Sequence, residues 1–263
     1  CVAITAGIDT GKYRLHWNVK AFRTCGSVSV IEYGEQPTKS KEVGVERGLR
    51  DALAELRAYF MSGWRDSSGK KWLPSQVWID SGYHEHKVPV YEFCHMANHD
   101  IPLGQEIYRP AKGFGEGQRG MTRYHAPTEK NRGVRFIGTE YDFRWQRSER
   151  ILLVDINADY WKSQFHQRLA IPKDEHGSIS LYDSPNPDEH LTYSQHITAE
   201  VQREEFMAGR GEVIVWRRER RENHYLDAGY LALAAGDFVL SAMEQKKSQP
   251  KTSGWFAAQR KTG

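Results

Sequence analysis

The chain has 263 residues, 39% of them hydrophobic and 12% aromatic, which suffices for one large core. Its net charge of only +3 favours no class of partner, so any argument for nucleic acid must rest on local clusters. Three cysteines without a CxxC pair argue against a disulfide framework and favour a reducing compartment. No apolar run approaches the roughly 20 residues of a membrane span, and no signal peptide is visible.

The first half of the chain predicts a three-stranded antiparallel meander followed by alternating helices and strands. The apolar run VAITAGIDT, the alternating YRLHWNVKAF and the stretch SVSVIEYG are typical of strands. The segment 43–60 places Leu49, Leu53, Leu56 and Phe60 on one face of a helix. SQVWIDSGY then predicts a buried strand, and VPVYEFCHMANH predicts a helix. Because the chain begins without Met and inside a strand, we expect it to be a domain of a longer protein.

The second half opens with a segment of different character. Residues 109–135 are rich in glycine and basic residues and show little periodicity, which predicts a long basic loop. Further on, ERILLVDIN and GEVIVWRRE are typical of strands, whereas 158–170, 193–206 and 221–240 have the pattern of helices. Residues 1–245 are therefore expected to form one domain, and 246–263 a basic, flexible tail. This order of elements predicts an α/β domain with an RNase H-like fold and a mixed central sheet.

Three aspartates stand where carboxylates carry chemistry in such folds. Asp9 and Asp80 each follow a short apolar strand directly, and the carboxyl ends of parallel strands are where functional groups gather. Asp227 lies at the edge of the apolar face of the C-terminal helix, where an ionised group is costly unless it is paired or holds a metal. Each aspartate alone is equally typical of a turn or a helix cap. Together they predict an oxygen-rich site for two Mg²⁺ or Mn²⁺ ions.

The chain resembles the C-terminal nuclease domain of lambda-type phage terminase large subunits. The resemblance rests on AGIDTGKYRLHW, VWIDSGYHEHKVPVYEFC, VDINADYWKSQFHQRLA, GEVIVW and ENHYLDAGYLALAA, in that order, from residue 1 to about 243. It implies an RNase H-like endonuclease that cuts concatemeric double-stranded viral DNA by two-metal hydrolysis, with Asp9, Asp80 and Asp227 as catalytic and metal-binding residues. The segment around 109–135 departs from the family pattern, so the role of this segment stays open.

The resemblance also implies partners. These are an ATPase domain N-terminal to this segment, a small terminase subunit and the portal, in the cytoplasm of the host cell and without a membrane. GIDTGKY contains a Gly-Lys pair but does not match GxxxxGK[ST], so no ATP site is expected in this segment.

Several further residues are candidates for a supporting role. His84 and His86 follow Asp80 and are either outer-shell partners of the metal site or surface histidines. Lys162 stands where the family tends to carry a lysine and is either a phosphate contact or an exposed helical lysine. One helical turn before Asp227, Asn223 is expected to cap the helix and His224 to lie near the metals. Zinc at Cys94, His95 and His99, and metal ligation by Glu140 or Asp142, are weak alternatives.

Basic residues predict two DNA-contacting surfaces. Arginines suit phosphate recognition, and no sequence-reading motif is evident, so contacts to phosphate and shape are expected. One set lies in the basic segment: Arg109, Lys112, Arg119, Arg123, Lys130, Arg132 and Arg135. Phe114 and Tyr124 stand among them. The second set precedes the C-terminal helix: Arg217, Arg218, Arg220 and Arg221. Interspersed glutamates make a solvated salt-bridge face the alternative for the second set.

Three other functions remain open on the sequence alone. A junction resolvase or recombinase would use similar acids but prefer branched DNA. A non-catalytic DNA-binding assembly module would use its aspartates structurally and show no dependence on metal. Half of an actin-like sugar kinase shares the strand-end aspartate but needs glycine-rich phosphate turns that this chain lacks.

Overall fold

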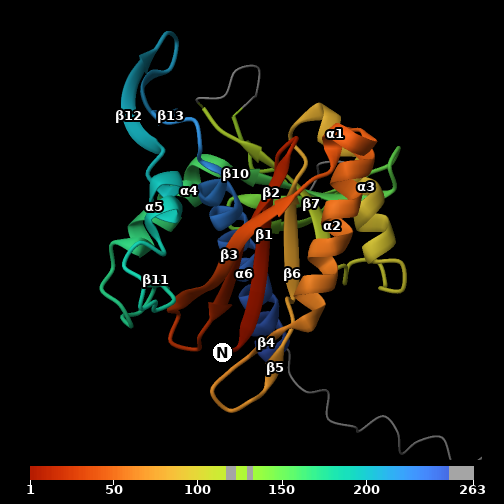
Figure 1. Cartoon of the computed structure of the whole chain (residues 1–263). Helices are drawn as coiled ribbons and strands as arrows, with labels where there is room; N and C mark the ends of the chain where they lie inside the picture. Colours follow the sequence, from red (N-terminus) through yellow and green to blue (C-terminus); the bar gives the residue numbers. More distant parts are fainter. Residues whose placement is uncertain (117–122, 129–132, 249–263) are drawn as a thin grey trace, which may run out of the picture.

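The computed structural model describes residues 1–116, 123–128 and 133–248 (Figure 1). Its strands are β1 (Ala3–Thr10), β2 (Arg14–Phe22), β3 (Val28–Pro37), β4 (Trp64–Arg65), β5 (Lys71–Trp72), β6 (Gln76–Asp80), β7 (Tyr108–Phe114), β8 (Val134–Gly138), β9 (Tyr141–Gln146), β10 (Ile151–Asn157), β11 (Ile179–Leu181), β12 (Glu200–Met207) and β13 (Gly211–Arg218). Its helices are α1 (Ser40–Val43), α2 (Val45–Ser62), α3 (His84–Ala97), α4 (Ala158–Leu169), α5 (Leu191–Ile197) and α6 (His224–Ser248).

A mixed sheet forms the centre of the domain. In the part of the chain that the structure describes, nine strands pair in the order β11-β3-β2-β1-β6-β7-β10-β9-β8. The first three strands form the predicted antiparallel meander, and β1, β6, β7 and β10 then run parallel to one another. The order β3-β2-β1-β6-β7, with β2 reversed, is that of an RNase H-like domain. The predicted fold class is confirmed.

The two faces of the sheet are covered by different helices, as Figure 1 shows. Side chains alternate along a strand, so Ile4, Ala6 and Ile8 of β1 belong to the core that α2 and α3 complete. The opposite face of the sheet packs against α4, α5 and α6. Trp78 of β6 belongs to this second core, whereas its neighbours Val77 and Ile79 belong to the first. Residues in odd positions of β1 and even positions of β6 therefore face α6.

Helix α6 crosses β1 at very short range because β1 carries a glycine there. A Cβ atom built on Gly7 would lie 2.0 Å from the carbonyl oxygen of Ala228 and 2.6 Å from the backbone nitrogen of Ala232. The hydroxyl of Thr5 donates a hydrogen bond of 2.6 Å to the carbonyl of Ala232. By length and composition alone, His224–Gln245 is apolar enough to cross a membrane, so the expectation that no segment reaches this apolarity is wrong. Within the fold this segment is the central core helix.

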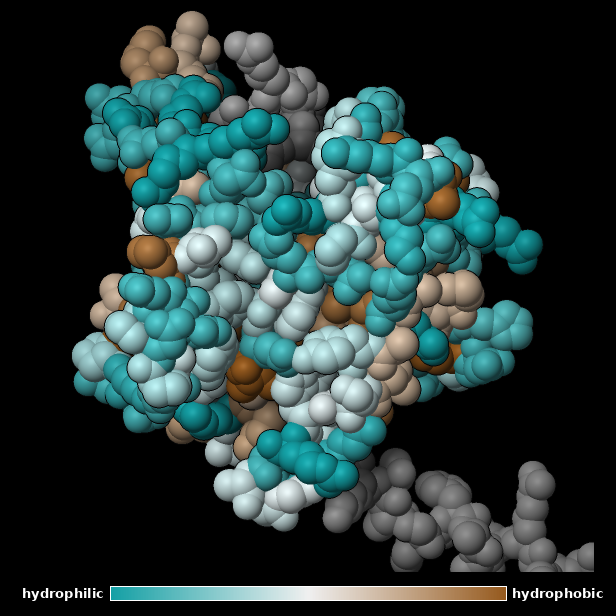
Figure 2. All heavy atoms as spheres, viewed as in Figure 1, coloured by the Kyte–Doolittle hydropathy of each residue, from teal (hydrophilic) through white to brown (hydrophobic). Residues whose placement is uncertain are grey.

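The helix predicted over 193–206 is wrong in its second half. Helix α5 ends at Ile197, and β12 then pairs with β13 over eight residue pairs in an antiparallel hairpin. Gly209 and Gly211 have φ values of 78° and 77°, a backbone conformation that favours glycine and turns the chain between the strands. Pairing between distant residues thus overrides the local helical pattern. Figure 2 shows hydrophobic residues at the tip of this projecting hairpin, where Phe206 is 78% exposed.

The basic loop predicted over 109–135 is also shorter than expected. Residues 108–114 form β7, a central strand between β6 and β10, and 134–138 form the edge strand β8. The strand was not predicted because Pro110 and Gly113 interrupt the apolar pattern typical of a strand in YRPAKGF. In the structure, hydrogen-bonded pairing with β6 and β10 on its two sides stabilises it as a strand. Arg119, Lys130 and Arg132 lie outside the described residues, as does the tail from 249 onward.

Candidate functional site

The three predicted aspartates meet at one edge of the sheet. Asp9 is the penultimate residue of β1 and Asp80 the last residue of β6, and the parallel register pairs Ile8 with Ile79 directly before them. Both side chains therefore project toward α6. Asp227 lies in the first turn of α6, which the close approach at Gly7 brings over the same edge. The structure thus brings the carboxylates of Asp9, Asp80 and Asp227 to the same edge of the sheet.

Burial and the neighbouring charge of Asp9 raise the pKa of two of these carboxylates. Burial, followed by the charge of Asp9, raises the pKa of Asp80 to about 7. Burial also raises the pKa of Asp227, to about 6, with Lys162 acting against the rise and Asp9 adding to it. The site therefore carries negative charge that the protein compensates only in part. A divalent cation would remove this cost, and carboxylate oxygens are the ligands that Mg²⁺ and Mn²⁺ prefer.

Asp227 is held by a buried network. Lys162 of α4 donates to Glu200 at 2.7 Å and lies 3.1 Å from Oδ1 of Asp227. The amide of Asn223 donates to Oδ2 of Asp227 and to Glu200, both at 2.6 Å. Although burial disfavours its ammonium, Asp227 and Glu200 raise the pKa of Lys162. The pair of carboxylates therefore keeps Lys162 charged.

This network changes two interpretations of the sequence. The alternative of an exposed helical lysine at position 162 is wrong, because the side chain is 6% exposed. The side chain of Asn223 bonds carboxylates, while its backbone carbonyl accepts the amides of Leu226 and Asp227 at the start of α6. Glu200 did not emerge from the sequence, because it lies in the segment predicted as a helix.

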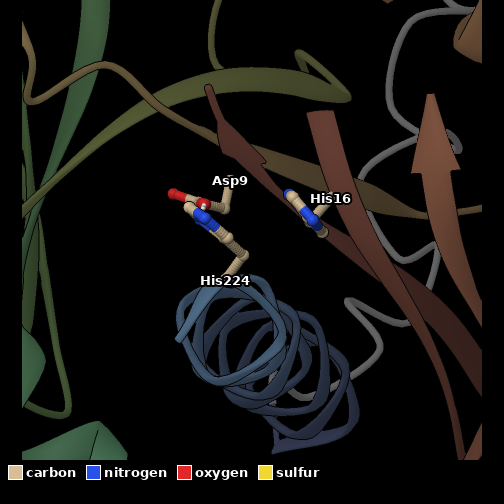
Figure 3. A group of neighbouring side chains, drawn as sticks. All are labelled: Asp9, His16 and His224. Carbon is tan, nitrogen blue, oxygen red and sulfur yellow. Dashed lines mark hydrogen bonds and ion pairs between the residues drawn. The ribbon is translucent and has the colours of Figure 1, made fainter. Parts of the chain in front are cut away.

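Two histidines adjoin Asp9 (Figure 3). His224, at the start of α6, places Nδ1 2.6 Å from Oδ2 of Asp9, and this hydrogen bond, against burial, raises the pKa of the imidazole. The ring of His16 stacks on that of His224 with centroids 4.3 Å apart. Ligand atoms of Asp9, His16 and His224 all lie within 4.8 Å of one another, a spacing that suits a metal ion. The structure thus places His224 beside Asp9, and its expected position near metal ions stays a prediction.

His16 was not singled out from the sequence. It faces Asp9 directly across the β1–β2 ladder. The short turn between these strands could have given this register, because residues paired across a hairpin share a face. Burial and the neighbouring His224 lower the pKa of His16 to about 4.

The remaining histidine and acidic candidates lie in α3, in β9 and in the turn before β9. Helix α3 begins at His84, earlier than predicted, and His84 is exposed. His86 is 4% exposed, so it is not a surface histidine, and its Nδ1 lies 3.1 Å from the hydroxyl of Thr10. Asp142 is buried and accepts a hydrogen bond from Tyr124. Glu140 accepts one from the amide of Asn157.

The Cys94 group does not form a zinc site among the described residues. Cys94 is buried, and burial raises the pKa of its thiol. His95 and His99 are exposed, and His99 bonds Asp100 at 2.9 Å.

The basic residues divide into buried and accessible ones. Arg109 is 1% exposed and pairs with Glu106 at 2.9 Å, so it stabilises the interior and is not available to a DNA backbone. Lys112 is partly buried in β7, and Arg135 is exposed on the edge strand β8. Arg123 lies 3.3 Å from Glu116. Among the described residues of the first predicted set, Arg135 lies exposed on an edge strand and is accessible to a DNA backbone.

The arginines before α6 also separate into two groups. Arg217 bonds Glu205 within the β12–β13 hairpin, and Arg220 bonds the carbonyl of Gln195 at 3.1 Å. The Arg217 contact matches the salt-bridge alternative, whereas Arg220 bonds a backbone carbonyl. Arg218 and Arg221 also form ion pairs, 3.6 Å from Glu200 and 3.7 Å from Glu222, and both line a cavity next to His224.

An RNase H-like sheet with converging carboxylates at the carboxyl ends of its central strands is the arrangement of metal-dependent nuclease domains of this fold. The chain belongs to the family of terminase large subunit gpA endonuclease domains, whose model matches residues 1–247. The resemblance seen in the sequence is confirmed.

Two solved structures match the chain, both with low scores. The nuclease domain of the large terminase g2p from bacteriophage SPP1, with bound Mn, matches with a TM-score of 0.37 at 10% identity, covering 89% of this chain and 86% of that one. A member of the Ppx/GppA family from Aquifex aeolicus matches with a TM-score of 0.28 at 14% identity, covering 94% of this chain and 99% of that one. No curated protein matches the chain. Neither structure is close enough to transfer a ligand to individual residues.

Proposed function

We propose that this domain is a divalent-metal-dependent endonuclease that cuts concatemeric double-stranded viral DNA during genome packaging. The observation that carries the proposal is the convergence of Asp9, Asp80 and Asp227, with raised pKa values at Asp80 and Asp227. Membership of the terminase endonuclease family supplies the substrate class. The ATPase domain, the small terminase subunit and the portal are partners proposed from the same membership, as is action in the host cytoplasm.

The donor set of the site fits two Mg²⁺ or Mn²⁺ ions. Asp9, Asp80 and Asp227 would hold them, and such ions lower the pKa of an attacking water and stabilise the departing oxygen. The protein's own groups fix the geometry. Asn223 and Lys162 hold both oxygens of Asp227. The backbone amide of Gly82 donates to Oδ1 of Asp80 at 3.1 Å.

His224 and His16 give the Asp9 end of the site a different character. Imidazole nitrogens suit transition metals better than Mg²⁺. A cation next to Asp9 is therefore expected to be Mn²⁺ in preference to Mg²⁺. His224 also fixes the rotamer of Asp9 through its 2.6 Å contact.

The test is nicking of supercoiled plasmid with Mn²⁺, Mg²⁺ or EDTA. Asp80→Asn and Asp227→Asn keep the size of the side chains and are expected to abolish nicking while the proteins remain folded. Asp100→Asn is the matched control, because Asp100 has 96% of its side chain exposed on the surface. Undiminished nicking by either site variant would remove that residue from the proposal.

A comparison of substrates separates the rival functions. A four-way junction cut faster than linear duplex would favour a resolvase. A folded wild-type protein that binds DNA, cuts neither substrate and ignores metal would favour a non-catalytic assembly module.

A further inference from the structure

A cavity opens directly beside the acidic site. It has a volume of about 740 Å³ and lies between the β1–β2 turn, β3, α5 and the segment that joins β13 to α6. His224 lines this cavity and also contacts Asp9. Any occupant therefore lies next to the carboxylates proposed for catalysis. The volume is within the usual range of about 300–1,000 Å³ for small-molecule sites.

Two buried histidines in the cavity wall lack partners for a ring nitrogen. His16 and His196 are 5% and 6% exposed, and the Nδ1 atom of each has no hydrogen-bond partner among the described residues. Buried polar atoms are normally satisfied. Both rings also pack against Tyr225, with centroids 5.3 Å and 4.8 Å from it. The inner wall of the cavity therefore contains two polar atoms that the described residues leave without a partner.

The charge of the cavity favours an anion. The cationic side chains in its lining are Lys12, Arg14, Arg218 and Arg221, against the carboxylates Glu35 and Glu222. The acids are already engaged, and so are three of the cations: Arg14 pairs with Glu35, Arg218 lies 3.6 Å from Glu200, and Arg221 lies 3.7 Å from Glu222. Glu35 accepts from Arg14 at 2.5 Å and lies 3.3 Å from His16, and Glu222 lies 3.0 Å from His224.

Lys12 and Tyr13 form the outer wall. Lys12 is exposed and forms no ion pair within the part of the chain that the structure describes, while its Nζ lies 5.6 Å from the centre of the Tyr13 ring. Tyr13 is 49% exposed. A free ammonium beside an exposed aromatic ring is the combination that holds a phosphate and stacks a base.

We propose that this cavity binds the nucleotide next to the scissile phosphodiester of the cut strand. The proposal rests on the proposed nuclease function and assigns the substrate contacts of the Asp9 side of the site. Lys12 and Arg221 contact the backbone phosphate, and the Tyr13 ring stacks on the base. His16 and His196 form the inner wall against which the nucleotide packs. Because stacking and phosphate contacts accept any base, this subsite adds affinity without sequence preference.

The test measures binding apart from cleavage. The full chain in EDTA is titrated with the dinucleotide pdTdT, and separately with inorganic phosphate, while the imidazole NMR resonances of the histidines are followed. Saturable shifts at His16 and His196 with pdTdT are expected, and much weaker ones with phosphate. Lys12→Ala and Tyr13→Ala should each weaken pdTdT binding about five- to tenfold. Lys70→Ala, on the distant β4–β5 hairpin, is the matched control and should stay within about twofold.

Three outcomes overturn the proposal. Shifts confined to other histidines would place the nucleotide elsewhere. Equal binding of phosphate and pdTdT would reduce the cavity to an anion site. Unchanged pdTdT binding in both the Lys12 and the Tyr13 variant would show that these residues do not form the subsite. If plasmid nicking still depends on metal alongside any of these results, the nuclease proposal is unaffected. If the wild-type protein shows no metal-dependent nicking, the nuclease proposal is contradicted independently of the cavity.

Discussion

Replacing Asp80 by asparagine is expected to stabilise the metal-free protein while abolishing nicking. Asparagine keeps the acceptor oxygen that the amide of Gly82 bonds, but it removes the charge that repels Asp9. The rise from the ordinary value of 3.8 to about 7, at about 1.4 kcal/mol per unit, sets an upper limit of about 4 kcal/mol. Water reaches this partly exposed carboxylate, so screening reduces the expected gain to about 1–2 kcal/mol. For a domain of this size that is about 3–6 °C in Tm.

The sign of the effect depends on pH. A raised pKa means that ionisation is costly in the folded state, so stability is lost as pH rises from 3.8 toward about 7. The gain of Asp80→Asn should therefore be full at about pH 8 and vanish near pH 4. Calorimetry in EDTA measures it, and Mn²⁺ should reverse the order by stabilising only the wild type. A variant that is less stable than the wild type at pH 8 without metal would refute the idea that repulsion dominates this site. Asp100→Asn should change Tm by less than about 1 °C, as expected for a surface substitution.

Three further changes probe the same edge of the sheet. Lys162→Met should cost about 3–5 kcal/mol in thermal unfolding, because Glu200 and Asp227 lose their buried partner; adding Glu200→Gln should recover part of this loss, and no recovery would contradict the pairing. Gly7→Ala should lower Tm and abolish nicking together, because its Cβ would meet the backbone of α6 at 2.0 Å; a fully active, stable variant would exclude the close crossing. At subsaturating Mn²⁺, the nicking rate should rise between about pH 6 and 8, as Asp227 and Asp80 lose the protons that their pKa values of about 6 and 7 retain; a flat profile would mean that these groups do not titrate during metal binding.

The sequence predicts the sheet edge well because strand ends are local features. Asp9 and Asp80 follow apolar runs that read as strands by themselves, and the rule that functional groups lie at carboxyl ends brings them together. The apolar spacing of Leu226, Tyr230 and Leu233 likewise predicts α6, and all three are buried in the structure. The sequence did not predict how closely α6 approaches β1. This distance is short because Gly7 of β1 has no side chain where α6 crosses it.

The partners of the carboxylates were harder to predict because they come from pairings between distant segments. Glu200 belongs to β12, which forms a strand because it pairs with β13. The local sequence pattern around Glu200 favours a helix instead. For Lys162 the sequence left a phosphate contact and an exposed position as equal alternatives, and its burial against Glu200 and Asp227 depends on how α4, β12 and α6 meet. The position of His16 opposite Asp9 could be predicted only from the register of β1 with β2. In each case the missing information is which elements meet, not what each element is.

These partners explain why the three carboxylates differ. Asp227 has a lysine and an amide on its two oxygens, and Asp9 has His224. Among the described residues, the carboxylate of Asp80 accepts a hydrogen bond from the backbone amide of Gly82. The least compensated group should have the most perturbed acidity, and the pKa of Asp80, about 7, is indeed above that of Asp227, about 6. Lys162 lowers the pKa of Asp80 by less than burial and Asp9 raise it, so a cation that neutralises this carboxylate would stabilise the folded site.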